Sequence, residues 1–304
     1  MPRQRGRKLN GWLVLDKPAG LISNQALNRI KRIYQPQKAG MAGILDPLAT
    51  GILPIAFGEA TKTVAHVVDA SKSYRFTVRW GIATDTDDAD GDVIATSEAR
   101  PSRAAIEAAL PAFTGVIMQV PPRFSAIKVA GERAYDLARD GESFGLTPRP
   151  VEVFSLKVVA MPDADTCIFE ADCGKGTYVR AMARDLGEAL GCHGHIAALR
   201  RTRVGAFGEA MAVPLARIEA AAEASDSLAL DGFIEPVESA LSGIPSLTVS
   251  RHDAQMLRRG QAILLRGRNA PIIEGNVYAV SDGVLVAIGE VSRGELQPLR
   301  VFHL

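Results

Sequence analysis

The segment 74–80 constrains the fold of this chain most, because its seven residues alternate without interruption between apolar and polar side chains. Successive side chains of a β-strand point to opposite faces, so Tyr74, Phe76, Val78 and Trp80 would all lie on one face. A strand with such an apolar face is stable only when that face is covered. The segment therefore predicts a half-buried strand in a sheet that packs against other elements.

Other segments predict further elements around this strand. Three of them have the apolar content of strands: 11–15, 151–160 and 166–173. Helices are predicted from Ser23, which is a suitable N-cap, over 177–190 and over 252–259. Gly191 follows the second helix in the position where a left-handed residue commonly ends a helix. Brief strands separated by glycines are predicted over 261–304.

The chain has 304 residues, of which 47% are hydrophobic, so it is expected to form two domains with sizeable cores. A break rich in Ser, Gly and Pro at 241–246 predicts a basic tail (1–8), a large domain (9–242) and a small domain (247–304).

Three cysteines without a CxxC pair predict reduced thiols in the cytoplasm. No export signal is recognised, and no apolar stretch approaches the roughly 18 residues of a membrane span.

The net charge of +1 hides an uneven distribution of charged residues. Cations gather in four places: the N-terminal tail, the helix after Ser23, residues 200–203 and residues 251–268. Acidic side chains are concentrated in 85–92 and 219–238. A single basic cluster is usually a solvated face, but four of them favour a groove for a polyanion. The acidic stretches are then expected to face away from that groove or to brace arginines inside the protein.

Asp46 lies in a segment rich in glycine and apolar residues, 43–53, and is followed by Pro47. On structural grounds this pair begins a helix, since aspartate caps free N–H groups and proline suits the first turn. Alternatively, an aspartate between Leu45 and Leu48 projects into a dry cleft as a carboxylate nucleophile, provided that a cation keeps it ionised. These residues alone leave both interpretations open.

Several motifs together resemble the TruB family of tRNA pseudouridine synthases. Within residues 9–205 they run GWLVLDKPAG (11–20), LDPLATGILP (45–54), GEATK (58–62), KSYR (72–75), TDTDDADG (84–91), PPRFSAIK (121–128) and KGTYVR (175–180). Each motif alone is a weak signal, whereas their shared order is specific. The resemblance implies an enzyme without cofactor or metal that isomerises a uridine in the T loop of tRNA, at position 55. The C1′–N1 bond of that uridine is exchanged for a C1′–C5 bond.

The same resemblance implies an α+β fold. A pseudouridine-synthase catalytic domain (9–242) would have a central mixed β-sheet flanked by helices, and a small C-terminal β-rich domain (247–304) would resemble an RNA-binding domain of PUA type. The segment 125–150 is expected to be a mobile loop that clamps RNA. The resemblance also implies a cytoplasmic, monomeric enzyme that acts on the T arm of tRNA without a protein partner.

The matching motifs imply roles for individual residues. Asp46 corresponds to the catalytic aspartate and Arg180 to its arginine partner, which suits a buried charge that must be paired. Attack at C1′, addition to C6 and removal of the 2′ proton remain open as the first step of the carboxylate. Tyr74 corresponds to a tyrosine that lies against the target base and helps to remove its C5 proton. A core aromatic at the head of a strand is the structural alternative for Tyr74.

Further residues match positions around the base. Tyr178 and Leu199 correspond to the base pocket, and Lys17 is expected to support the active-site loop, with a phosphate contact as the alternative. The target base must leave the tRNA stack to be reached. Met41 stands where the family usually has a histidine, which predicts an altered flipping contact. Phe124 stands where a tyrosine is common, so a hydroxyl is missing there.

Two other interpretations of the chain remain. A non-catalytic RNA-binding or RNA-folding protein on the same scaffold would keep the basic clusters, although Asp46, Tyr74 and Arg180 are all present. A guide-RNA-dependent synthase of the dyskerin type would bring partner proteins and a longer tail. Two segments could suggest a metal site, but neither is expected to be one. The acidic segment 85–92 lacks the ligands that a calcium-binding loop needs at its first and last positions. The Cys-His-Gly-His sequence at 192–195 lacks the second group of ligands that would complete a zinc site.

Overall fold

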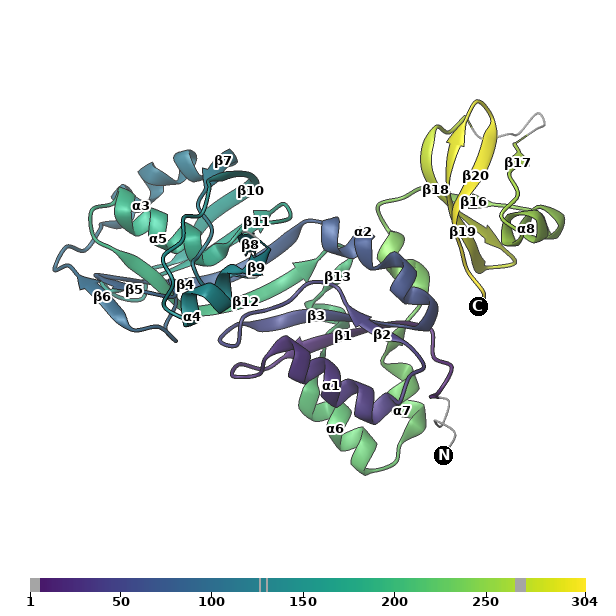
Figure 1. The fold of residues 1–304 in the computed structure, drawn as a ribbon, viewed down its shortest axis with the longest axis horizontal. Coiled ribbons are helices and arrows are strands. Elements are labelled where there is room, and N and C mark those ends of the chain that lie inside the picture. The colour runs from purple at the N-terminus through teal and green to yellow at the C-terminus, as the bar shows by residue number, and fades with distance from the viewer. Residues whose placement is uncertain (1–5, 126, 130, 266–271) are drawn as a thin grey trace.

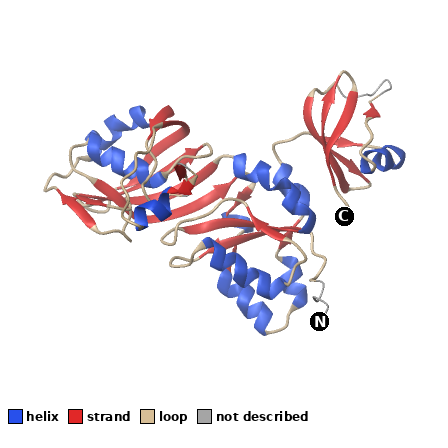
Figure 2. Ribbon diagram, in the orientation of Figure 1, coloured by secondary structure: helices blue, strands red, loops and turns tan. Residues whose placement is uncertain are grey.

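The computed structural model describes residues 6–125, 127–129, 131–265 and 272–304 (Figure 1). Most of the predicted basic tail 1–8 lies outside these residues, as do Arg266 and Arg268 of the C-terminal basic cluster. In the described ranges no helix is long and apolar enough to cross a membrane. Figure 2 shows a large part, in which helices accompany an extended sheet, and a small C-terminal part built mainly of strands.

A mixed sheet of eleven strands forms the large part of the described structure. Its main order is β14 (Val213–Pro214), β1 (Gly11–Lys17), β3 (Thr50–Phe57), β12 (Gly194–Val204), β4 (Lys72–Trp80), β11 (Thr166–Cys173), β10 (Arg149–Ala160) and β7 (Gly115–Gln119). Short strands β2 (Ala39–Met41), β13 (Phe207–Gly208) and β15 (Ile234–Glu235) pair beside it. All four strands predicted from the sequence of this part are present.

The alternating segment forms most of β4, as predicted. Phe76, Val78 and Trp80 are buried on one face, whereas Arg75 and Arg79 on the other face are exposed. A period of two therefore identified both the strand and its covered face.

Helices α3 (Arg103–Ala109) and α5 (Val179–Ala189) lie beside the half of the sheet that contains β4, β11, β10 and β7 (Figure 1). Phe169 of β11 stacks on Phe76 with ring centroids 5.4 Å apart. Met182 of α5 is fully buried in the same hydrophobic cluster. Packing of the apolar face of β4 thus fixes where the first turn of α5 lies, and this turn carries Arg180.

The other half of the sheet carries α1 (Ser23–Tyr34), α6 (Leu215–Glu223) and α7 (Ser227–Gly232) (Figure 1). Ser23 was predicted to be the N-cap of α1, but the helix begins at Ser23 and Ile22 precedes it as N-cap. The Ser23 hydroxyl instead donates to the carbonyl of Leu45 at 2.9 Å and accepts the Leu45 N–H at 2.8 Å. A local capping signal was overridden by a contact with a residue 22 positions away.

The remaining elements are short. They are η1 (Gly58–Thr63), α2 (Val64–Asp69), the hairpin β5 (Ile82–Thr84) and β6 (Val93–Thr96), η2 (Leu110–Phe113), η3 (Glu209–Met211) and η4 (Val237–Leu241). The segment 125–150 was expected to be a loop. Its described part instead contains β8 (Lys128–Val129), β9 (Glu132–Arg133) and α4 (Ala134–Arg139).

A separate sheet of five strands follows. Its order is β16 (Ser246–Thr248), β18 (Gly275–Ser281), β19 (Val284–Ser292), β20 (Glu295–Val301) and β17 (Ile263–Leu264), and α8 (Arg251–Arg258) packs against it. The Lys62 ammonium of η1 donates to the Val301 carbonyl at 2.8 Å, and the neighbouring Phe302 is fully buried. The α+β fold with a C-terminal β domain is confirmed.

Strand β12 joins the two halves of the large sheet, because it pairs with β4 in antiparallel and with β3 in parallel orientation. At the junction with β3, Gly51 has a φ of +98°, and a β-carbon there would overlap the Arg201 carbonyl. Gly115 in β7 has a similar φ of +88°, but a β-carbon there would meet nothing within 4 Å. Replacing Gly115 would therefore introduce backbone strain alone, whereas replacing Gly51 would introduce backbone strain together with a steric overlap.

We predict that Gly51→Ala lowers the free energy of unfolding by about 3 kcal/mol or more, since left-handed strain and overlap with a paired strand add. Gly115→Ala carries only the strain, and we expect a loss of about 1 kcal/mol. Urea denaturation of both variants measures the difference. Equal losses would contradict a close approach at the β3–β12 junction.

Candidate active site

Asp46 lies in the loop that connects β2 to β3. No helix begins at Asp46 and Pro47, so the interpretation of this pair as a helix start is wrong. The Ala49 N–H donates to the Asp46 carbonyl at 3.1 Å, and the chain then enters β3 directly. Because β3 must start at Thr50 to pair with β12, only a turn fits between Asp46 and the sheet. The Asp46 carboxylate is left free to project from this turn.

Lys17 lies beneath this loop and is fully buried. Its ammonium donates to the carbonyls of Pro18 and Leu21, both at 2.8 Å, and to that of Pro47 at 3.3 Å. Burial lowers the pKa of Lys17 to about 8, which the nearby Asp46 carboxylate opposes. These contacts agree with the expectation that Lys17 supports the active-site loop. They do not favour the alternative of a phosphate contact, because the side chain has no exposed surface.

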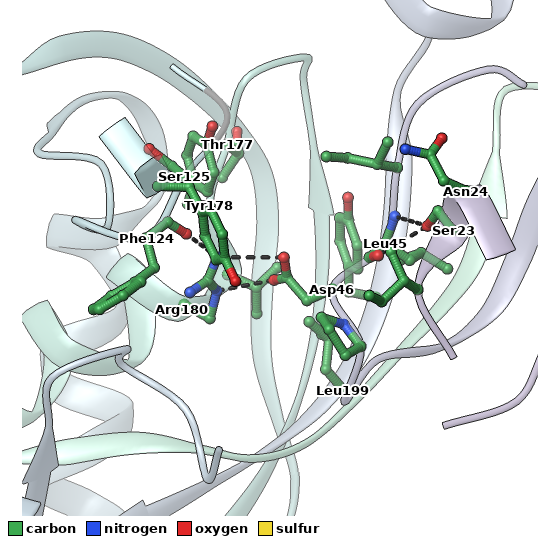
Figure 3. A pocket seen from close by; sticks show the side chains of 16 residues that line it. Ser23, Asn24, Leu45, Asp46, Phe124, Ser125, Thr177, Tyr178, Arg180 and Leu199 are labelled. Atoms are coloured by element: carbon green, nitrogen blue, oxygen red, sulfur yellow. Dashed lines mark hydrogen bonds and ion pairs between the residues drawn. The ribbon is translucent and has the colours of Figure 1, made fainter. Parts of the chain in front are cut away.

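Asp46 and Arg180 form an ion pair (Figure 3). Arg180 Nε lies 2.9 Å from Asp46 Oδ2, and Nη2 donates to Oδ1 at 3.3 Å. The guanidinium also donates to the carbonyls of Phe124 at 2.9 Å and Thr86 at 2.8 Å. The Arg180 side chain is 6% exposed and that of Asp46 is 33% exposed. The arginine is therefore held inside the protein, while the carboxylate keeps an open side.

The charge state of Asp46 depends on opposing influences. Burial raises the pKa of the Asp46 carboxyl, the Arg180 guanidinium opposes this, and the Asp88 carboxylate raises it further. Asp88 Oδ2 lies 3.6 Å from Arg180 Nη1 and is itself almost fully covered. Arg180 is thus shared between two carboxylates, of which only Asp46 is accessible from the cavity.

The first acidic stretch braces arginines inside the protein, as expected, whereas the ion pairs of the second stretch are solvent-exposed. Asp88 faces Arg180, and Asp87 Oδ2 lies 2.9 Å from Arg184 Nη1, one helical turn further along α5. In the second stretch, Asp231 pairs with Arg7 at 2.6 Å, and Glu219 pairs with Arg29 at 3.3 Å.

The basic cluster at 200–203 requires a correction. Arg201 is only 3% exposed, and it donates to the carbonyls of Ile52 at 2.8 Å and Ile44 at 3.1 Å. Arg200 forms a two-point ion pair with Asp16 at 3.0 and 2.9 Å. Arg201 is therefore structural, because its position in the sheet turns it into the protein, whereas Arg200 and Arg203 are partly exposed and each pairs with a carboxylate, Arg203 with Asp172 at 3.3 Å.

A cavity of about 390 Å³ opens above Asp46. Its lining includes Tyr74. Tyr178 and Leu199 also line it, together with the ion pair (Figure 3). Pockets for small organic groups commonly measure about 300–1,000 Å³, so this one suits a single nucleoside. Burial raises the pKa of the Tyr74 hydroxyl, and the Arg201 guanidinium opposes this. Tyr74 is consequently a protonated phenol near neutral pH.

The structure brings five of the seven predicted site residues together. Met41 and Lys17 do not line the cavity. Met41 is half-buried in β2 opposite Ile55, so its expected contact with RNA stays a prediction.

Sequence reasoning missed several residues of the site: Ser23, Asp88, Gln119, Tyr135 and Thr177. For Asp88 a signal existed, because Arg180 and Arg184 lie one turn apart on a buried helix and need acidic partners. For Ser23 and Gln119 the contacts depend on distant segments, and no local pattern marks them.

Two family descriptions match the chain. Residues 31–179 match the N-terminal domain of the TruB family pseudouridylate synthases, and residues 180–242 match the C-terminal domain of tRNA pseudouridylate synthase B. A protein of Bradyrhizobium diazoefficiens named tRNA pseudouridine synthase B is 58% identical over 99% of this chain and 88% of its own length. Its Agrobacterium fabrum namesake is 54% identical over 99% of this chain and 96% of its own length.

Solved structures agree in fold. A chain of an H/ACA ribonucleoprotein bound to a substrate RNA containing 2′-deoxyuridine superposes with a TM-score of 0.74 at 23% identity, covering 97% of this chain and 85% of that one. A Cbf5–Nop10–Gar1 complex gives a TM-score of 0.73 at 24% identity, covering 96% and 84%. With family matches that together span residues 31–242 and full-length relatives above half identity, the chain belongs to the TruB family of pseudouridine synthases.

Proposed function

We propose that this protein isomerises the uridine at position 55 in the T loop of tRNA to pseudouridine. The observation that carries the proposal is the accessible Asp46 carboxylate, paired with the buried Arg180 at the floor of a cavity of nucleoside size. A scaffold that only bound RNA would have no use for a buried arginine whose carboxylate partner faces a cavity, since burial of a charge costs several kcal/mol. The names of the relatives support tRNA as the substrate.

The reaction requires an accessible base. A uridine stacked in the T loop is out of reach, so it must flip into the cavity. Tyr74 and Leu199 would then hold the base, and Tyr178 would flank it. Asp46 acts while the C1′–N1 bond breaks and the uracil re-attaches through C5. The C5 proton leaves and N1 gains a proton, so the exchange balances without an oxidant or reductant.

The protonation states of Asp46 and Tyr74 suggest different roles for these two side chains. Because Arg180 opposes the effect of burial on the pKa of Asp46, we assign Arg180 to keeping that carboxylate ionised and oriented. Tyr74 carries its proton near neutral pH, since burial raises the pKa of the phenol. We therefore assign Tyr74 first to holding the base. It could accept the C5 proton only after losing its own.

Segments outside the cavity would recognise the rest of the RNA, and we assign them by their place in the chain. We propose that 9–242 is the catalytic domain, that 125–150 closes on the T arm, and that 247–304 grips RNA in the manner of a PUA domain. Tyr135 of this closing segment and Phe124, the residue just before it, line the cavity and pack edge to face with ring centroids 6.0 Å apart. Closure there would cover the target base directly. We further propose that the chain acts in the cytoplasm as a monomer without a protein partner.

Replacing Asp46 tests the catalytic assignment. Asp46→Asn keeps the size of the side chain but removes the charge that Arg180 pairs with, and we expect tritium release from [5-³H]uridine-labelled tRNA to fall by at least about 10³-fold. The dissociation constant for tRNA should change by less than about threefold, because the RNA contacts remain. Asp90→Asn, an exposed aspartate, is the matched control. Undiminished release by Asp46→Asn would refute the assignment.

A T-arm RNA tests stand-alone action. The purified chain alone should convert the uridine equivalent to position 55 in a bare T-arm hairpin, since the cavity, the ion pair and the closing segment all come from one chain. Carbodiimide labelling followed by primer extension maps the modified position. Conversion at another uridine, or only after a guide RNA or second protein is added, would contradict the proposal.

A further inference from the structure

Gln119, at the end of β7, makes an unusual pair of contacts with one residue. The residue is 1% exposed. The nitrogen and the oxygen of its side-chain amide each form a hydrogen bond with the main chain of Tyr178. Nε2 donates to the Tyr178 carbonyl at 3.1 Å, and Oε1 accepts the Tyr178 N–H at 2.8 Å. The glutamine thus pairs with Tyr178 in the way that a neighbouring strand would.

The two main-chain groups of Tyr178 differ in what else holds them: the carbonyl also accepts the Met182 N–H at 3.1 Å, whereas in the described structure the N–H bonds to Gln119. Tyr178 precedes α5 with extended dihedral angles (φ −103°, ψ 113°), so its N–H lies outside the helix. Buried N–H groups need a partner, and Gln119 provides one. Holding both the N–H and the carbonyl of a residue fixes the direction of its Cα–Cβ bond. The contact therefore sets where the Tyr178 side chain enters the cavity.

Arg149 contacts the ring of the same tyrosine. It is the cross-strand partner of Gln119 in the β7–β10 pair. Its guanidinium carbon lies 5.3 Å from the centroid of the Tyr178 ring, which is within the range of a cation–π contact. Gln119 and Arg149 are also the two residues at which the chain leaves and re-enters the sheet around the segment 120–148. The two ends of segment 120–148, which holds most of the proposed closing segment 125–150, are thus joined to a wall of the cavity.

We propose that Gln119 is a positioning residue for the pseudouridine synthase reaction: through the main chain of Tyr178 it holds the tyrosine ring against the target base. Arg149 restricts the same ring through its cation–π contact. The inference rests on the proposed function, because it takes Tyr178 as part of the base pocket. It adds a residue that touches neither the base nor Asp46.

The test is a double-mutant cycle with Gln119→Leu and Tyr178→Ala, measured as single-turnover tritium release from labelled tRNA. Gln119→Leu keeps the volume and loses both hydrogen bonds, and we expect release to slow by about 10- to 100-fold, as for a misplaced contact group. Tyr178→Ala should slow release at least as much. In the double variant, Gln119→Leu should add nothing, because the ring through which it acts is gone.

Controls separate positioning from loss of stability. Ile106→Val, a buried change in α3 of the same half of the sheet, should lower the melting temperature and leave the rate unchanged. Should Gln119→Leu fail to fold, Arg149→Met takes its place in the cycle with the same expectation. The dissociation constant for tRNA should stay within about twofold in all variants.

Three results would overturn the inference: no rate effect of Gln119→Leu, the same slowing by Gln119→Leu in the Tyr178→Ala background, or full activity of Tyr178→Ala. None of these bears on Asp46→Asn. Full activity of Asp46→Asn would refute the proposed function instead, so the two failures are distinguishable.

Discussion

The contact between Asp46 and Arg180 is the interaction on which the rest of the site depends. Its two residues are 134 positions apart in the chain, and they meet only because β3, β12 and β4 are neighbours in one sheet. Arg180 is so deeply covered that its guanidinium needs acceptors on several sides, and it finds them in Asp46, Asp88, Thr86 and Phe124. Three loops and one helix are therefore tied to a single cation.

The loops around the ion pair are also fixed by hydrogen bonds from buried polar side chains. Lys17, Ser23, Gln119 and Arg201 are all buried polar side chains, and each bonds to the main chain of a distant or irregular segment. An unpaired buried polar group costs about 1–3 kcal/mol, more when it is charged. Alternative loop arrangements would leave these groups unpaired, so the loops have one favourable conformation. The cavity walls that these loops form are therefore fixed, which is what orientation of a flipped base requires.

Local sequence patterns predicted the scaffold better than the loops. The alternation over 74–80 identified β4 and its buried face, and the spacing before Gly191, which adopts a φ of +68°, identified α5. The family resemblance, not local pattern, pointed to Asp46 and Arg180. Ser23 and Arg201 could not be placed, because a serine or an arginine has the same local signature on the surface as beneath a loop. Their burial follows from strand pairing between segments distant in the chain.

The central claim is that Arg180 keeps Asp46 ionised against the effects of burial and of Asp88. It is tested most directly by a ¹³C NMR titration of the aspartate carboxyls, with the Asp46 signal assigned by its absence in Asp46→Asn. The account predicts that Asp46 titrates above the usual aspartate range. Its midpoint should move further up in Arg180→Gln and down in Asp88→Asn. An Asp46 midpoint in the usual range that neither substitution moves would contradict the account.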